Sequence, residues 1–274
     1  MNSKKVSNHI VKWLKDYANK AHIKGFVIGV SGGVDSAVTA SLCAKTGLEL
    51  LILEMPIHQA ANQVNRGVEL INQLKNKYPR VSSKRVDLTT TFDTFKKAIP
   101  AENLDFSLEN KAKYSLALAN SRARLRMTTL YYYAGLYGYL VAGTGNKVED
   151  FGVGFYTKYG DGGVDLSPIA DLMKSEVYEL AAYLDVPTSI RNAAPTDGLF
   201  GDDRTDEDQL GASYDELEWA MQQLDNNKTK SDFSGREKEV FEIYTRLHHI
   251  NQHKMIPIPV CEISEEIKQS TQKT

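Results

Sequence analysis

Cysteine is scarce in this sequence, and its spacing excludes two common kinds of site. Only Cys43 and Cys261 are present, far apart, and neither lies in a CxxC pair or another metal-ligand spacing. A disulfide scaffold or a zinc site would need more cysteines. Cys43 falls within an apolar, helix-like run, where a small buried thiol is the expected state. We therefore expect a protein of a reducing compartment, the cytoplasm.

The sequence also lacks a long apolar run at its N-terminus and a strong net charge. Charged residues interleave the first turns, so we expect neither a secretory signal nor a membrane span. Acidic and basic residues number 35 and 33, which gives a formal net charge of -2. Without a global positive field, nucleic acid is not expected as the main partner. The length of 274 residues fits one α/β domain with appended segments.

Apolar periodicity predicts alternating helices and strands in the first half of the chain. At 6–21, apolar residues recur at helical spacing with lysines opposite, which indicates an amphipathic helix. Apolar runs too short for helices indicate buried strands at 26–30, 48–55, 81–88 and 139–142. Further helical stretches lie at 34–45, 60–77 and 111–137. This alternation predicts an α/β fold, a doubly wound parallel sheet of about five strands flanked by helices.

Polar, glycine-bearing stretches begin where predicted strands stop. In a parallel sheet, ligands bind outside the carboxyl ends of the strands, so these stretches are the candidate site. Two of them, 144–170 and 196–211, are long and have little apolar period. Long irregular loops in a compact domain are commonly active-site lids or disordered segments.

The segment Gly29–Ser36, GVSGGVDS, has the features of a phosphate-binding loop. Its glycines allow close approach of the backbone, its two serines supply hydroxyls, and a predicted helix N-terminus follows. It is not a GxGxxG fingerprint, because Ser31 stands at the second glycine, and no Gly-Lys-Ser/Thr closes it as in a Walker A loop. A strand-to-helix turn with Asp35 near the helix start is the plain structural alternative.

The run SGGVDS resembles the SGGxDS motif of the N-type ATP pyrophosphatases. That resemblance implies cleavage of ATP between its α and β phosphates, activation of an acceptor as an adenylate, and release of pyrophosphate. Later segments resemble the NAD synthetases of this superfamily, in order along essentially the whole chain: GTGNKVE at 143–149, TKYGDGG at 157–163, VDLSP at 164–168, APTDGL at 194–199, SYDE at 213–216 and HK at 253–254. Val148 departs from the pattern, which often has a small or polar residue there, but the adjacent Glu149 is intact.

The resemblance implies an ATP site with bound Mg²⁺. Hard oxygen ligands suit Mg²⁺, and the implied metal ligands are Asp35 and Glu149. Lys174 is implied to bind ATP phosphates, and with Asp35 it is the implied catalytic pair; we place it near the start of a helix opened by Asp171. The ATP-binding residues implied by the match are Gly29, Val30, Ser31, Gly32, Gly33, Val34, Asp35, Ser36, Thr144, Lys174 and Thr196.

For the second substrate, deamido-NAD, the resemblance implies cations for its anionic groups and carboxylates for its ribose hydroxyls. The implied residues are Arg124, Lys158, Asp165, His253, Lys254, Asn120 and Asp161. Arg122, Arg124 and Arg126 alternate on one predicted helix and fan over different faces, so only Arg124 is assigned. The tyrosines at 131–139 are interpreted as core or subunit contact rather than base stacking. The family implies a homodimer whose deamido-NAD site uses both subunits.

The implied reaction is ATP-dependent amidation of deamido-NAD with ammonia. Adenylation of the nicotinate carboxylate would release pyrophosphate, and ammonia would displace AMP; no protein nucleophile is needed. The resemblance implies that residues 1–274 form a single synthetase domain, and we therefore expect no glutaminase domain of the kind that glutamine-using relatives carry. Free ammonia or a separate glutaminase partner remains as the nitrogen source. The loops at 144–170 and 196–211 are expected to close over the adenylate.

Two alternatives stay open. One is another adenylating enzyme of the superfamily, such as a tRNA-modifying thiolase or a lysidine synthetase, but the charge balance and cysteine positions disfavour it. The other is a catalytically silent nucleotide-binding module, which would have less reason to keep both metal carboxylates.

Overall fold

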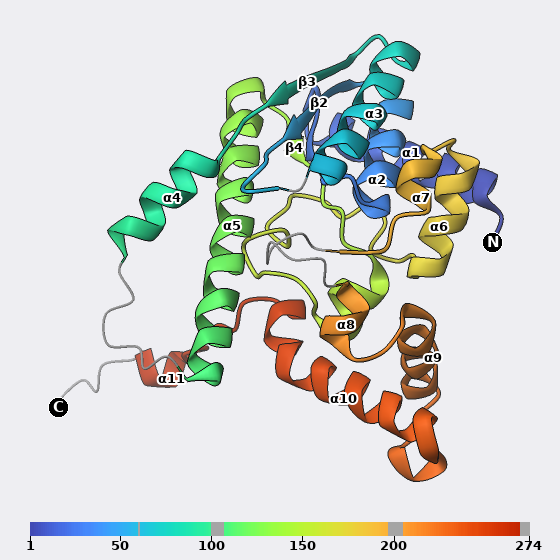
Figure 1. The fold of residues 1–274 in the computed structure, drawn as a ribbon, viewed down its shortest axis with the longest axis vertical. Helices are drawn as coiled ribbons and strands as arrows, with labels where there is room; N and C mark the ends of the chain where they lie inside the picture. The colour runs from blue at the N-terminus through green and yellow to red at the C-terminus, as the bar shows by residue number, and fades with distance from the viewer. Residues whose placement is uncertain (60, 100–106, 197–204, 269–274) are drawn as a thin grey trace.

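A parallel β-sheet lies at the centre of the computed structural model, which describes residues 1–59, 61–99, 107–196 and 205–268 (Figure 1). The strand order is β3-β2-β1-β4. The strands are β1 Gly25–Gly29, β2 Glu49–Glu54, β3 Val81–Arg85 and β4 Leu140–Val141. In register, Phe26 of β1 pairs with Leu50 on one side and Leu140 on the other. The predicted α/β class and parallel sheet are confirmed, but with four strands among the described residues and a single bridge from Ala142 to Leu166 where a fifth would lie.

Alternate residues of β1 enter two separate apolar layers, which explains why its run is apolar throughout. Phe26 and Ile28 pack in the layer beneath α1, α2, α3 and α6, whereas Val27 packs in the layer beneath α4 and α5. Figure 1 shows α5 along one side of the sheet and α1, α2 and α6 on the other. These helices are α1 Ser3–Lys20, α2 Val34–Lys45, α3 Ala61–Lys77, α4 Thr89–Ala98, α5 Leu108–Tyr137 and α6 Lys174–Tyr183.

The predicted helices at 6–21, 34–45, 60–77 and 111–137 correspond to α1, α2, α3 and α5. Helix α4 was not predicted. In α1 the apolar stripe is narrower than its sequence indicates, because Ile10 and Leu14 are buried but Trp13 and Tyr17 are 40% and 42% exposed. Their rings lie 5.7 Å apart on the surface.

A third apolar cluster, built by the C-terminal half, lies beside the carboxyl end of the sheet. The cluster is formed by a π-helical segment and two long helices, and it includes Val148, Leu217 and Tyr244. The π-helical segment lies in the stretch 144–170, which was expected to be irregular. The elements of this half are η1 Lys147–Val153, α7 Thr188–Arg191, α8 Asp206–Leu210, α9 Tyr214–Asp225, η2 Lys230–Asp232, α10 Gly235–Met255 and α11 Glu265–Lys268. Of the stretch expected as a second lid, residues 197–204 lie outside the described residues.

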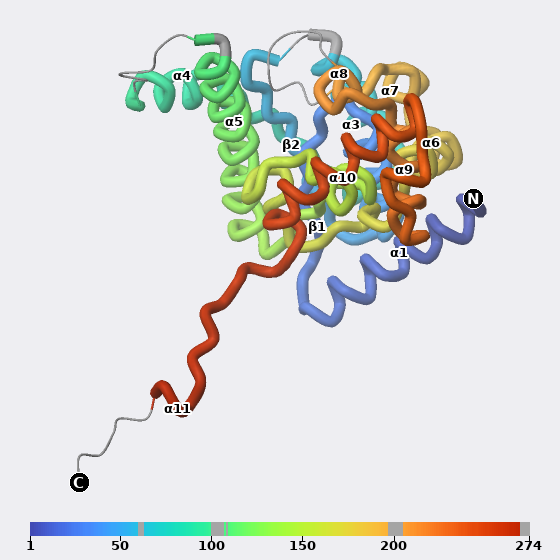
Figure 2. Tube along the Cα trace, turned by 90° about the horizontal axis from the view of Figure 1, so that it is seen from below, coloured from blue at the N-terminus to red at the C-terminus, as the bar shows by residue number. Residues whose placement is uncertain are grey.

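Beyond α10 the chain runs as an extended arm away from the body, as the red trace in Figure 2 shows. The arm, residues 256–268, carries large apolar side chains in the open, with Ile258 and Val260 exposed by 67% and 79%. Cys261 lies on it, also exposed, whereas Cys43 is buried and burial raises the pKa of its thiol to about 12. Within the described ranges, no helix combines the length and hydropathy needed to cross a bilayer.

Candidate functional site

The loop after β1 presents an uncapped helix N-terminus to a pocket. Helix α2 begins after Gly33, and among the described residues no side chain caps its first turn, so its first N–H groups can bind an anion. The two serines set the shape of the loop: Gly33 N donates to Ser31 Oγ at 3.2 Å, and Ser36 Oγ donates to the Gly33 carbonyl at 3.0 Å. All eight residues from Gly29 to Ser36 line the pocket.

Lys174 lies between the two predicted metal carboxylates. Its Nζ is 2.7 Å from Asp35 Oδ2 and 2.8 Å from Glu149 Oε1, and the lysine is only 3% exposed. Asn146 joins the same group, because its Nδ2 donates to Asp35 Oδ1 at 3.0 Å and its Oδ1 accepts from Glu149 N at 3.1 Å. Asn146 and Lys174 therefore converge on Asp35, although they lie 111 and 139 positions after it in the sequence.

Burial and ion pairing act in opposite directions on these charges. Burial favours the neutral amine, but the two carboxylates outweigh it and raise the pKa of Lys174. Burial also raises the pKa of Asp35. For Glu149 burial opposes ionisation, but Lys174 and hydrogen bonds from Tyr214 and Asn146 outweigh it and lower the pKa. Lys174, Asp35 and Glu149 thus stabilise one another as buried charges, whereas each of these charges would be unfavourable in the interior without its partners.

The start of the helix that carries Lys174 differs from the predicted one. Helix α6 begins at Lys174 itself, not at Asp171, because hydrogen-bonded turns hold the preceding residues and Leu172 N donates to the Ile169 carbonyl at 3.0 Å. Asp171 instead pairs with Lys147 at 3.0 Å. A lysine in the first turn opposes the helix dipole, and the two carboxylates compensate for this.

Tyr214 and Asp206 belong to this group, and sequence reasoning assigned neither of them a role. The Tyr214 hydroxyl donates to Glu149 Oε1 at 2.5 Å and also lies 3.1 Å from Asp206 Oδ2. The ring stacks against Lys174, with Nζ 4.6 Å from its centroid. Tyr214 lies within the SYDE match, which was the available signal. Asp206 is one of six acidic residues in the polar stretch 196–211, and nothing in the sequence distinguishes it from the others.

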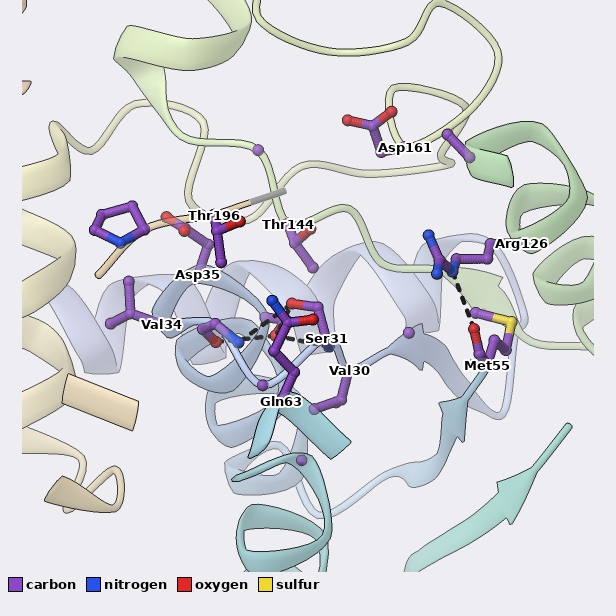
Figure 3. Close-up of a pocket in the computed structure, with 18 of the residues that line it drawn as sticks. Val30, Ser31, Val34, Asp35, Met55, Gln63, Arg126, Thr144, Asp161 and Thr196 are labelled. Carbon is purple, nitrogen blue, oxygen red and sulfur yellow. Dashed lines mark hydrogen bonds between the residues drawn. The ribbon is translucent and has the colours of Figure 1, made fainter. Parts of the chain in front are cut away.

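The pocket has a volume of about 270 Å³ and lies at the carboxyl end of the sheet. Thr144, Thr196 and Asp161 line it as well, so the predicted ATP residues all reach one cavity. Figure 3 shows Asp35, Thr144 and Thr196 together at one end and Arg126 with Met55 at the other.

Of the residues predicted for deamido-NAD, only Asp161 lines this pocket. It accepts from Thr157 N at 2.9 Å, and Thr157 Oγ1 donates to Asn120 at 2.7 Å, which fixes the GDGG turn against α5. Desolvation of its carboxyl group raises the pKa of Asp161 to about 6, although the residue as a whole is exposed.

The remaining cations of that set form a separate group on the surface. Arg124 donates to the Lys158 carbonyl at 3.3 Å, and Lys158 Nζ donates to the His253 carbonyl at 2.5 Å. Lys254 donates to the carbonyls of Gly154 and Tyr156 at 2.7 and 2.9 Å. His253 and Lys254 both lie in the last turn of α10.

Asp165 lies apart from both groups. One oxygen accepts from the Tyr131 hydroxyl at 3.0 Å and the other from Val141 N at 2.8 Å. Its carboxylate thereby links β4 to α5 in the single chain, and it does not line the pocket.

Two arginines reach the pocket that sequence reasoning did not assign. Arg126, set aside in favour of Arg124, donates to the Met55 carbonyl at 3.0 Å and to Gln59 Oε1 at 2.9 Å. Arg66 donates from Nε to the Gly32 carbonyl at 3.1 Å. Arg122, Arg124 and Arg126 point in different directions from α5, as expected. Which of them reaches the pocket depends on how α5 is rotated against the sheet.

The donor set suits Mg²⁺ bound together with a nucleotide. No group of three or more His, Cys, Asp or Glu side chains forms a metal cage in the part of the chain that is described. Mg²⁺ is usually held by one or two carboxylates, with substrate phosphates and water completing the shell. Asp35 and Glu149, joined by Lys174, match that requirement in chemistry.

The comparisons with known proteins agree with one another. The sequence profile of a family described as NAD synthase matches residues 6–257. The NH(3)-dependent NAD(+) synthetase of Mesoplasma florum is 39% identical over 93% of this chain and 95% of its own length. Among solved structures, the NMN synthetase of Francisella tularensis has a TM-score of 0.82 at 32% identity, covering 96% of this chain and all of its own. The NH3-dependent NAD synthetase of Campylobacter jejuni has a TM-score of 0.73 at 26% identity, with the same coverage.

Proposed function

This chain belongs to the NAD synthase family, and from that premise we propose that it amidates deamido-NAD to NAD with ammonia and ATP, releasing AMP and pyrophosphate. The observation that carries the proposal is the convergence of Asp35, Glu149 and Lys174 beside the glycine loop. An anion-binding loop and two carboxylates suited to Mg²⁺ supply what departure of pyrophosphate requires.

The ATP phosphates are assigned to the loop Gly29–Ser36. The first turn of α2, which no side chain caps in the part of the chain that is described, lines the same pocket as Thr144 and Thr196. Asp35 and Glu149 would hold Mg²⁺, which supplies positive charge to the leaving pyrophosphate when bound. Lys174 keeps both carboxylates in place before the nucleotide arrives.

The reaction proceeds in two displacements. An oxygen of the nicotinate carboxylate forms a bond to the α-phosphorus, and the bond from that phosphorus to the bridging oxygen breaks as pyrophosphate leaves. Ammonia then forms a bond to the carbonyl carbon, the bond to the AMP oxygen breaks, and one proton is lost from nitrogen. The protein contributes position and charge, and no side chain forms a covalent bond.

The rest of deamido-NAD is assigned to the surface group of Arg124, Lys158, His253 and Lys254, together with Asn120 and Asp161 at the GDGG turn. Asp165, which lies apart from both groups, is assigned to the same substrate. Only Asp161 of these lines the pocket of the single chain. Completion of the site by a second copy, as in a homodimer, would bring this group to the pocket of its partner. Free ammonia is the proposed nitrogen source, and the cytoplasm the proposed location.

A second candidate substrate is the corresponding mononucleotide, whose amidation would give NMN. The Francisella relative with the TM-score of 0.82 is described as an NMN synthetase. The separation of the cationic surface group from the pocket also fits a substrate that ends at its first phosphate.

One assay tests both candidates. The chain is incubated with ATP, Mg²⁺ and ammonium and either deamido-NAD or nicotinate mononucleotide, and NAD, NMN, AMP and pyrophosphate are quantified. We expect AMP and pyrophosphate in equal amounts to NAD. A kcat/KM at least about 10-fold higher for the mononucleotide would favour the second candidate. ADP and phosphate as products would refute both.

A further inference from the structure

The pocket needs positive charge beyond Lys174. Three cationic side chains line it among the described residues, namely Arg66, Arg126 and Lys174. Lys174 is matched by two carboxylates, so that group carries a net charge of about -1 before any metal binds. An incoming polyphosphate would therefore find no net attraction there.

Arg126 lies at the other end of the pocket from Asp35, beside Met55 (Figure 3). Its guanidinium donates to the Met55 carbonyl and to the Gln59 side chain. It therefore lies away from the end of the cavity where Asp35 follows the glycine loop.

Arg66 lies directly against the glycine loop. Its Nε donates to the carbonyl of Gly32 at 3.1 Å, and no ion pair with a carboxylate is found for it among the described residues. Helix α3 packs so closely that a Cβ added to Gly32 would lie 2.4 Å from the Gln63 carbonyl oxygen and 3.4 Å from Arg66 Cβ. Figure 3 likewise shows Gln63 of α3 beside Ser31.

We propose that Arg66 binds the pyrophosphate portion of ATP, with Nε fixed on the Gly32 carbonyl and its remaining N–H groups turned to the β and γ phosphates. Hydrogen bonds from a guanidinium to a phosphate are charge-assisted and roughly twice as strong as neutral ones, and the bond to Gly32 already holds this positive charge beside the loop. The inference rests on the proposed function and assigns to this site a cation that acts where a lysine acts in a Walker A loop.

The test measures binding of inorganic pyrophosphate with Mg²⁺ to the full chain by calorimetry. Arg66→Gln removes the charge but leaves an amide that can donate to Gly32, and Arg66→Lys keeps the charge. We expect Kd for pyrophosphate to rise at least about 10-fold in Arg66→Gln and at most about 3-fold in Arg66→Lys, as for loss of a charge-assisted hydrogen bond. Arg80→Gln, an exposed arginine just after α3, is the matched control and leaves Kd unchanged.

Several outcomes overturn the inference. Unchanged pyrophosphate affinity in Arg66→Gln does so, and equal losses in both variants would assign Arg66 to loop shape alone. If Arg66→Gln does not fold, the comparison is made between Arg66→Lys and the unchanged chain. An increase in Kd for pyrophosphate beyond about 10-fold in Arg66→Lys would then contradict a role for the charge of Arg66. Turnover by the unchanged chain without measurable pyrophosphate binding also overturns it, whereas absence of both turnover and binding refutes the proposed function itself.

Discussion

At the scale of single residues, Lys174 places one ammonium between two carboxylates. Replacing it in Lys174→Met leaves Asp35 and Glu149 facing each other without a counter-charge. We expect the free energy of unfolding in EDTA to fall by about 3 kcal/mol, as when one partner of a buried ion pair is removed. Turnover should fall at least about 100-fold.

Urea unfolding measures this loss, and Lys147→Met is the matched control. Its partner Asp171 has a side chain that is 97% exposed, so that ion pair contributes little and the variant should lose less than about 1 kcal/mol. Similar losses in the two variants would contradict the role given to Lys174.

Gly32 adopts a left-handed conformation at φ 84°, and α3 leaves no room for a side chain there. We expect Gly32→Ala to lose about 2–4 kcal/mol from the clash with the Gln63 carbonyl and from backbone strain. Gly47→Ala is the control, because φ is 72° there with nothing within 4 Å of the added Cβ, so strain alone costs about 1–2 kcal/mol. Thermal unfolding compares them, and equal losses would exclude a contribution from packing.

The raised pKa of Asp161 gives stability a defined pH dependence. The native state holds the proton more tightly than the unfolded chain, so this contribution is present below pH 3.8 and is lost as pH rises through about 6. Asp161→Asn keeps the acceptor for Thr157 N but has no proton to lose. Relative to wild type, we expect the variant to gain about 1 kcal/mol between pH 5 and 8, a value reduced for solvent exposure. Urea denaturation measures the free energy of unfolding of both proteins at each pH. A difference between them that stays constant from pH 5 to 8 would refute the prediction.

Site residues could be predicted where their position after a strand places them at the edge of the sheet. They could not be predicted where the rotation of a helix decides which side chain faces the pocket. Asp35 and Glu149 follow the ends of neighbouring strands, so parallel topology alone brings them to one edge. Arg66 and Arg126 lie on helices, where one residue of rotation turns a side chain by about 100° and sequence does not set the phase against a ligand.

At the scale of elements, the start of α9 supports the site because Tyr214 is its first residue. Ser213 accepts from Glu216 N at 3.3 Å, and Glu216 accepts from Ser213 N at 2.9 Å, which makes a capping box. We expect Ser213→Ala to lose about 1 kcal/mol of unfolding free energy. Ser234→Ala is the control, since that cap of α10 makes no side-chain hydrogen bond. Chemical denaturation measures both variants, and equal losses of unfolding free energy would contradict a stabilising role for the Ser213 cap.

The elements that sequence periodicity located are those that pack on the sheet. Helices α9 and α10 were missed because they pack on each other and on η1, so their apolar positions point several ways. Segment η1 was not predicted because it lies in a stretch rich in glycine and polar residues. Its side chains Val148 and Val153 are nevertheless buried, at 0% and 1% exposure. Tertiary packing overrides local propensity here.

At the scale of the whole molecule, the proposed association of two copies would cover apolar side chains that the single chain exposes. On α5, Tyr132 and Leu136 are 63% and 58% exposed, beside Tyr137 at 41%. We expect a dimer by sedimentation, and Tyr132→Asp with Leu136→Asp should weaken it at least about 100-fold, as for loss of central contacts. Trp13→Asp, at a 40% exposed position on α1, is the control. A monomer at every concentration would refute the dimer.

The two cysteines differ so much in environment that the natural chain offers a single point of chemical attachment. Cys261 stands in solvent on the arm, while the thiol of Cys43 is enclosed and keeps its proton at neutral pH. A maleimide dye or spin label should therefore attach once per chain without mutagenesis. In a dimer, the distance between two such labels would report where each arm goes.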